Sequence, residues 1–243
     1  MRTDSNASSI TGIWNNGSTT SPRGVLYNGS EPLAWALSSV ERNQPQLSNR
    51  THLDTRVVPD SPLWPNATSR YQTYEPPQIK VVVQVGCEED VATVLAFLQG
   101  QPRPRHDKYS GLVSRTEIDM QLLTGIEINA NGDSARFQGG TFTQEVMGVL
   151  WKQGYVATTE SCGCVGMVGL GLGGGHGRLQ GRYRLVSDKY LGLNVVLANG
   201  TVITVSETSH PNFFLGMKRA GHNFSVVTSF ELRIFPRQEE TWY

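Results

Sequence analysis

The chain has 243 residues, and its 21 lysines and arginines balance 21 aspartates and glutamates, which gives a net charge of zero at pH 7. The sequence also contains no basic stripe of the kind that binds nucleic acid, so we expect no nucleic-acid partner. No stretch approaches the roughly 18 consecutive apolar residues of a membrane span, so we also expect no transmembrane segment.

Residues 1–75 are polar and rich in Asn, Ser and Thr, and we interpret them as an N-terminal extension. A short helix is expected over Leu33–Val40, and the rest of this segment reads as extended or poorly ordered chain. Pro76-Pro77 marks a boundary. An alternating α/β pattern follows over residues 76–238, which leaves 239–243 as a tail.

The first part of this domain predicts a strand, a helix and three short strands. The β-branched run Ile79–Val85 predicts a buried strand. A helix is expected over 88–99, because acidic residues in its first turn suit the helix dipole and its apolar residues share one face. Short strands are expected over 116–120, 125–128 and 135–138.

The second part predicts two helices flanking a hairpin, and then a final strand. Thr141 and Gln144 have capping-box spacing, and the helix that they open is closed by Gly154. Asn199-Gly200 is the strongest short hairpin signal. The remaining elements are hairpin strands over 191–197 and 201–205, a helix over 212–219, and a strand whose residues 226, 228, 230, 232 and 234 alternate with more polar ones.

The most informative segment is 161–177, Ser-Cys-Gly-Cys-Val-Gly-Met-Val-Gly-Leu-Gly-Leu-Gly-Gly-Gly-His-Gly, which places seven glycines behind a cysteine pair. Exposed N–H groups in such a segment can form a nest for a pyrophosphate. No lysine follows the glycines, which argues against a P-loop. Gly169–Gly174 matches the letters of the dinucleotide fingerprint, but further glycines follow where that motif must open a helix. An irregular loop without a ligand is the third interpretation.

Three cysteines, Cys87, Cys162 and Cys164, are too few for a disulfide framework, and no second pair sits at a zinc-like spacing. The N-terminus lacks the apolar core of a secretory signal, yet the chain carries seven Asn-x-Ser/Thr sequons that hint at a glycoprotein of secretory ancestry. The compartment therefore stays open. The sequons are at Asn6, Asn16, Asn28, Asn49, Asn66, Asn199 and Asn223.

A series of ordered motifs from Pro76 to Pro236 resembles the FAD-binding domain of the berberine-bridge-enzyme-like, FAD-linked oxidases, particularly the fungal ones. The resemblance implies an α+β fold of the PCMH type, built from two α/β subdomains, with the substrate domain largely absent. The motifs are Val81-Val-Val-Gln84 with Glu89-Asp-Val91, Glu117-Ile-Asp-Met120, Phe137-Gln-Gly-Gly140, Cys162-Gly-Cys-Val-Gly166, Gly173-Gly-Gly-His-Gly177, Asn194–Gly200 and Ala220–Phe224 with Val226-Val-Thr228.

This resemblance implies that FAD is the cofactor and that the glycine-rich segment wraps it. Cys162 aligns with the cysteine that many members attach to C6 of the flavin; the alternative is a small buried residue in a tight turn. His106 is the only histidine available for the second attachment, at the 8α methyl, and an exposed loop histidine is the alternative. The implied cofactor-binding residues are Cys162, Val165, Gly166, Gly169, Gly173, Gly174, Gly175, His176, Gly177, Val226, Val227 and His106.

Two departures from the family pattern stand close to this set: Arg184 replaces a usual glycine, and so does Ser225. The resemblance implies an FAD-dependent oxidoreductase in fungal secondary metabolism that oxidises a small molecule, passes hydride to flavin N5 and is reoxidised by O₂. No catalytic residue is assigned, because the family's general base lies in the substrate domain. A degenerate, non-catalytic binding protein or a truncated gene product is the alternative.

Overall fold

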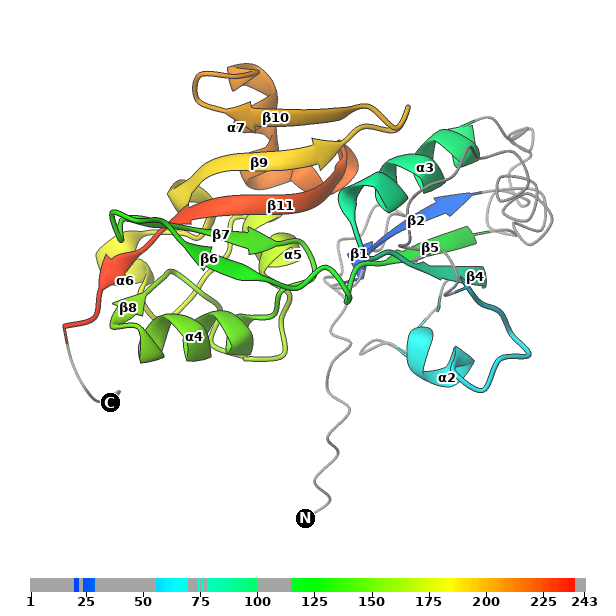
Figure 1. Ribbon diagram of the computed structural model, residues 1–243, viewed down its shortest axis with the longest axis horizontal. Helices are drawn as coiled ribbons and strands as arrows, with labels where there is room; N and C mark the ends of the chain where they lie inside the picture. Colours follow the sequence, from blue (N-terminus) through cyan, green and yellow to red (C-terminus); the bar gives the residue numbers. More distant parts are fainter. Residues whose placement is uncertain are drawn as a thin grey trace, which may run out of the picture.

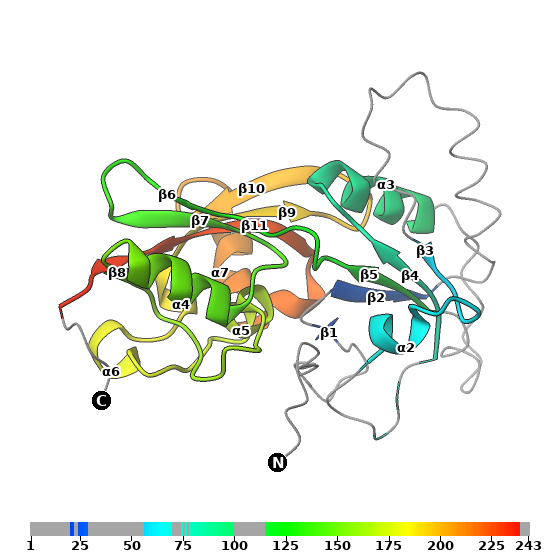
Figure 2. The same cartoon turned by 60° about the horizontal axis from the view of Figure 1, so that its bottom comes forward.

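The computed structural model describes residues 20–21, 24–28, 56–69, 74, 76, 78–99 and 115–238. Within them the chain forms two five-stranded sheets side by side, with helices packed against each (Figures 1 and 2). This confirms the α+β class and the two subdomains expected from the sequence. The helix expected over Leu33–Val40 lies outside the described residues.

The first sheet has the strand order β1-β2-β5-β4-β3, in which only the central pair β4 and β5 is parallel. Three of its strands come from the segment before residue 76, so the N-terminal region contributes directly to this sheet. Its strands are β1 (Thr20–Ser21), β2 (Gly24–Asn28), β3 (Arg56–Val57), β4 (Ile79–Gln84) and β5 (Arg115–Asp119), and α2 (Trp64–Ala67) lies between β3 and β4 in the chain.

The second sheet is antiparallel throughout, with the order β10-β9-β11-β7-β6. Helices α4, α5 and α7 contribute apolar side chains to one core with its inner face (Figure 2). The strands are β6 (Ile126–Ile128), β7 (Ser134–Gln138), β9 (Tyr190–Val196), β10 (Val202–Ser206) and β11 (Val226–Arg233). The helices are α4 (Thr143–Lys152), α5 (Met167–Leu172), α6 (Gln180–Tyr183), α7 (Pro211–Ala220) and the short η1 (Ser187–Lys189) and η2 (Gly221–Asn223); β8 (Tyr155–Val156) pairs with β12 (Phe235–Pro236).

Helix α3 (Glu88–Gln99) follows β4 in the chain and packs against both sheets. The Asp90 carboxylate accepts hydrogen bonds from the backbone N–H groups of Gly86 and Cys87, which fixes the start of the helix. The apolar face of α3 packs in one buried cluster with β4 and β5 and with Val196 and Val226 at the end of the second sheet. A single core therefore spans the boundary between the subdomains.

A β-bulge in β11 adds a polar contact across the same boundary. The register with β9 shifts between Val227 and Ser229, so Val227, rather than Thr228, shares a core with Phe230 and Leu232. The Thr228 hydroxyl bonds the carboxylate of Glu88 at the start of α3. Val226 and Thr228 are buried as the alternation predicts, but Val227 and Ser229 are buried as well, so the alternation fails in the first half of the strand.

Candidate functional site

The cysteine-containing turn, residues 161–166, sits at the N-terminus of α4. The Thr143 N–H donates to the Val165 carbonyl over 2.9 Å, and the Gln144 N–H donates to the Gly163 carbonyl over 3.0 Å. Both donors belong to the first turn of a ten-residue helix, where backbone N–H groups lack partners within the helix. The turn is thus fixed against the positive end of the α4 dipole.

Helix α4 itself begins one residue later than the capping box predicted. Phe142 is the residue before the helix, and its N–H donates to the carboxylate of Glu145 over 2.9 Å. The expected cap, Thr141, has a buried hydroxyl with no hydrogen-bond partner among the described residues. Of the two hydrogen bonds of a capping box, the one from the cap N–H to the carboxylate three residues later is present, one position later than predicted.

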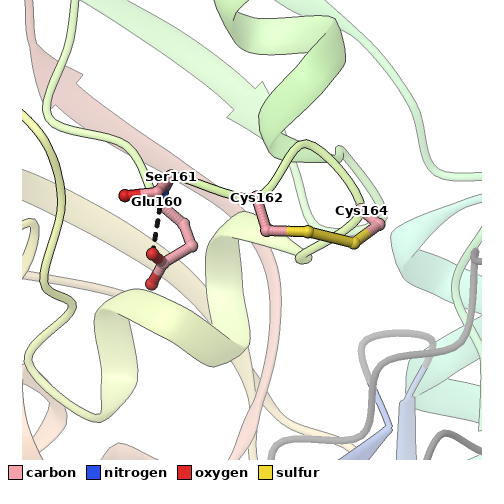
Figure 3. Close-up of a disulfide and its surroundings, with 4 residues drawn as sticks. All are labelled: Glu160, Ser161, Cys162 and Cys164. Carbon is pink, nitrogen blue, oxygen red and sulfur yellow. Dashed lines mark hydrogen bonds between the residues drawn. A yellow bond between two sulfur atoms is a disulfide. The ribbon is translucent and has the colours of Figure 1, made fainter.

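Cys162 and Cys164 are joined by a disulfide, with their Cα atoms 5.5 Å apart (Figure 3). Attachment of a flavin to Cys162 requires a free thiol, and in this structure the Cys162 sulfur is bonded to Cys164. Cys162 is exposed and Cys164 is half-buried. Cys87, beside α3, is a free cysteine, and burial raises the pKa of its thiol to about 11, so it stays protonated at neutral pH.

The turn carries several backbone donors that no protein group satisfies. Within the part of the chain that the structure describes, the N–H groups of Cys162, Gly163, Cys164 and Gly166 have no acceptor. Unpaired N–H groups gathered in one turn suit anionic or carbonyl oxygen atoms. The turn therefore fits the phosphate and ring oxygens of a flavin dinucleotide.

Several glycines of the segment are required by the protein's own packing. A Cβ on Gly171 would overlap the Tyr190 hydroxyl, and one on Gly175 would lie 2.8 Å from the Cβ of Val186. A Cβ on Gly177 would overlap the backbone carbonyl of Thr159. Gly174 has a φ of +104°, which L side chains rarely adopt. These four positions are explained without a ligand.

Gly169 is different, because a Cβ built on it meets no atom within 4 Å. It lies in α5, one turn after Gly166, and its φ is not positive. Gly173 is exposed, at the C-terminal end of α5. Of the predicted cofactor glycines, Gly166, Gly175 and Gly177 have N–H groups without an acceptor among the described residues, and Gly169 is the one beside which open space remains.

The helix α5 runs through the glycine-rich segment, where the sequence analysis found no helical pattern. The dinucleotide fingerprint at Gly169–Gly174 therefore begins inside a helix instead of preceding one, and the strand before it, β8, is antiparallel to its partner. This arrangement excludes the Rossmann interpretation.

A histidine to which the sequence analysis assigned no role supports this helix. His222 in η2 bonds the Gly169 carbonyl through Nε2 over 2.9 Å. Burial lowers the pKa of His222 below its ordinary value, so the ring is neutral at pH 7. By contrast, His176 is exposed and bonds Gln180 within its own turn. The short motif around His222 gave no signal that could have revealed its partner.

The other predicted site residues are spread over different places. Val165 is half-buried in the turn, whereas Val226 and Val227 are buried in two separate cores at the start of β11. His106 lies outside the described residues. The structure therefore gathers Cys162, Val165, Gly166 and Gly169, and their contact with a cofactor stays a prediction.

A cavity of about 480 Å³ lies beside α4, and the core residues Leu150 and Ala157 form part of its wall. Met147, Trp151 and Leu179 are among its apolar walls, and Lys152 and Arg178 are its charged residues. Gln144 lies both in the wall of this cavity and against the cysteine-containing turn, since its N–H donates to the Gly163 carbonyl. No group of three metal-binding side chains occurs among the described residues, and none of the helices described there could cross a membrane.

The two-sheet α+β fold and the donor-rich turn agree with the FAD-binding domain that the sequence motifs predict. The FAD binding domain family matches residues 79–206, more than half of the chain. The chain belongs to this family, as the resemblance to the berberine-bridge-enzyme-like oxidases predicts.

Individual relatives agree with this assignment. The chain is 51% identical over 222 residues to the FAD-linked oxidoreductase anuG of Penicillium roqueforti, covering 85% of this chain and 42% of that protein. Its fold matches 6-hydroxy-D-nicotine oxidase of Arthrobacter nicotinovorans with a TM-score of 0.68 and 26% identity, over 79% of this chain and 44% of the oxidase. It also matches glucooligosaccharide oxidase of Acremonium strictum with a TM-score of 0.66 and 21% identity, over 75% and 40% of the two chains. The chain thus spans less than half the length of these relatives.

Proposed function

We propose that this chain is the FAD-holding part of an oxidase-type FAD-dependent oxidoreductase. The observation that carries the proposal is the turn 162–166, in which four backbone N–H groups have no acceptor among the described residues, within a fold of the FAD binding domain family. FAD, when bound, supplies the two-electron chemistry, accepting hydride at N5 and returning electrons to O₂. The protein's part is to hold the ring and phosphates with the N–H groups of this turn.

The substrate we propose is a small molecule of a fungal biosynthetic pathway. Support comes from the 51% and 44% identical relatives, which are FAD-linked oxidoreductases of the fungi Penicillium roqueforti and Pestalotiopsis fici. We further propose Cys162 as a covalent anchor for the flavin. It is the exposed sulfur of the turn, and a fold relative, glucooligosaccharide oxidase, is described as carrying a 6-S-cysteinyl, 8α-N1-histidyl FAD.

The test is to incubate the purified chain with FAD, remove free FAD by ultrafiltration and record the visible absorption of the protein. We expect stoichiometric FAD, and we expect Gly169→Ala to weaken its retention about tenfold or more, because the methyl group enters the open space beside the turn; a factor of ten corresponds to about 1.4 kcal/mol. Gly181→Ala is the matched control, since that helix position also has nothing within 4 Å and lies in α6, away from the turn.

Equal retention in both variants would contradict the placement of FAD at this turn. A folded chain that retains no FAD would instead favour the non-catalytic alternative. The oxidase assignment is tested separately: after anaerobic reduction with dithionite, air should reoxidise the bound flavin with formation of hydrogen peroxide. A bound flavin that stays reduced in air would indicate another electron acceptor.

A further inference from the structure

The disulfide between Cys162 and Cys164 contributes little to holding the fold. It closes a ring over a single intervening residue, Gly163, and such a small ring removes little conformational freedom from the unfolded chain. The turn is already fixed by backbone hydrogen bonds from Thr143 and Gln144, and by the Met167 N–H, which donates to the Thr141 carbonyl over 3.1 Å. The fold can therefore tolerate both states of the sulfur pair.

The same disulfide is open to attack by an external thiol. Cys162 is an exposed residue, and disulfides at exposed positions are the ones that exchange readily with an external thiolate. The Cys164 sulfur would leave as a thiolate next to the N-terminus of α4 and the unpaired N–H groups of the turn, both of which stabilise negative charge. The nearby carboxylates of Glu145 and Glu160 are each bound by a backbone N–H, of Phe142 and Ser161, which limits their repulsion.

We propose that Cys162 and Cys164 form a redox-active pair, and that a dithiol reductant must open this disulfide before Cys162 can bond covalently to FAD. The second half of this proposal rests on the proposed function, since it concerns the same cofactor. The oxidised pair accommodates FAD without a sulfur bond, whereas the reduced pair provides the thiolate. Cys164 is then a residue that controls attachment and makes no bond to the flavin itself.

The chemistry balances with two named co-reactants. In the first step a dithiol of the thioredoxin class gives two electrons and two protons to the disulfide and leaves as its own disulfide. In the second step the Cys162 thiolate forms a bond to C6 of oxidised FAD, and C6 loses its proton. The electron pair passes from the ring to dioxygen, which takes up two protons to give hydrogen peroxide.

The first half is tested by alkylation and mass spectrometry of the folded chain. Without reductant we expect iodoacetamide at pH 8 to modify none of the cysteines appreciably, because the pKa of Cys87 is about 11 and the other two are bonded. After mild dithiothreitol treatment we expect two adducts, at Cys162 and Cys164, with Cys87 as the internal control. A disulfide that stays intact until the chain is unfolded would overturn the proposal.

The second half is tested with FAD in aerobic buffer, measuring the flavin that remains with the polypeptide after denaturation by absorption and intact mass. We expect attachment in the wild-type chain to rise at least tenfold after dithiothreitol treatment. Cys164→Ser should attach flavin without reductant, and Cys162→Ser should attach none under either condition.

The outcomes separate the two proposals. Equal attachment in oxidised wild-type chain and Cys164→Ser would overturn the redox control while leaving FAD binding intact. The redox control of attachment would also be overturned if FAD binds every variant but is released from all of them on denaturation. If no variant retains FAD by ultrafiltration before denaturation, the proposed function fails, and the flavin half of this inference fails with it.

Discussion

The substitution Gly171→Ala tests whether the glycines of α5 serve packing. A Cβ at Gly171 would overlap the Tyr190 hydroxyl and lie 2.5 Å from its Cζ, and Tyr190 is buried beneath the helix. Overpacking of this kind costs roughly 1–3 kcal/mol. Replacing glycine by alanine in a helix returns up to about 1 kcal/mol. We therefore expect a net loss of about 1–2 kcal/mol in the free energy of unfolding.

Gly169→Ala is the matched control, because it makes the same replacement two residues away in the same helix. No atom lies within 4 Å of the added Cβ, so only the helix-propensity gain applies, and we expect an increase in stability of up to about 1 kcal/mol. The difference between the two variants isolates the overlap, at about 1–3 kcal/mol. Urea unfolding of the flavin-free chain, followed by circular dichroism, measures both.

Tyr190→Phe provides a second check on the same reasoning. The Tyr190 hydroxyl has no hydrogen-bond partner among the described residues, so removing it loses no hydrogen bond. It should restore part of the stability lost in Gly171→Ala, since the nearest overlapping atom is then gone. If Gly171→Ala unfolds at the same urea concentration as Gly169→Ala, the close approach of α5 to Tyr190 is refuted.

Two further predictions concern backbone strain and pH. Arg184, at the end of α6, has φ +65° and ψ −158°, a region almost restricted to glycine, so Arg184→Gly should raise the unfolding free energy by about 1 kcal/mol. Arg182→Gly, two residues earlier and inside α6, should lower the unfolding free energy; equal urea midpoints for the two variants would contradict the strain at Arg184. Burial lowers the pKa of His222 in the folded chain. As the pH falls below about 6.5, His222 is therefore protonated more readily in the unfolded chain, and the free energy of unfolding decreases towards acid pH. His222→Gln should flatten that loss between pH 7.5 and 5, and parallel curves would exclude His222 as a source.

The sequence predicts the strands and longer helices well because each has a local cause. The β-branched run of β4 and the acidic first turn of α3 fix those elements wherever the chain places them, and Asn199-Gly200 forms the β9–β10 turn. The expected ranges agree with the observed ones within one or two residues. Local pattern was sufficient at these positions because burial and backbone preference favour the same conformation.

The helix α5 could not be predicted from local pattern. Glycine is among the poorest helix formers, and α5 contains Gly169 and Gly171 within six residues. Its conformation is supported by contacts from distant segments: the buried Tyr190 beneath it and the His222 ring on the Gly169 carbonyl. The same limitation applies to β2 and β3, whose partners lie far along the chain.

Glycine density by itself overstated how much of segment 161–177 is available to a ligand. Gly171, Gly175 and Gly177 are close-packed against Tyr190, Val186 and Thr159, so their missing side chains are explained by the fold. Unsatisfied backbone donors are a stricter criterion, because a packing glycine does not require them. By that criterion the proposed cofactor contact includes the cysteine-containing turn, where the disulfide lies, and the N–H groups of Gly175 and Gly177, which also have no acceptor among the described residues. The proposed attachment of the flavin and the oxidation state of the sulfur pair therefore depend on the same atoms, those of Cys162 and Cys164.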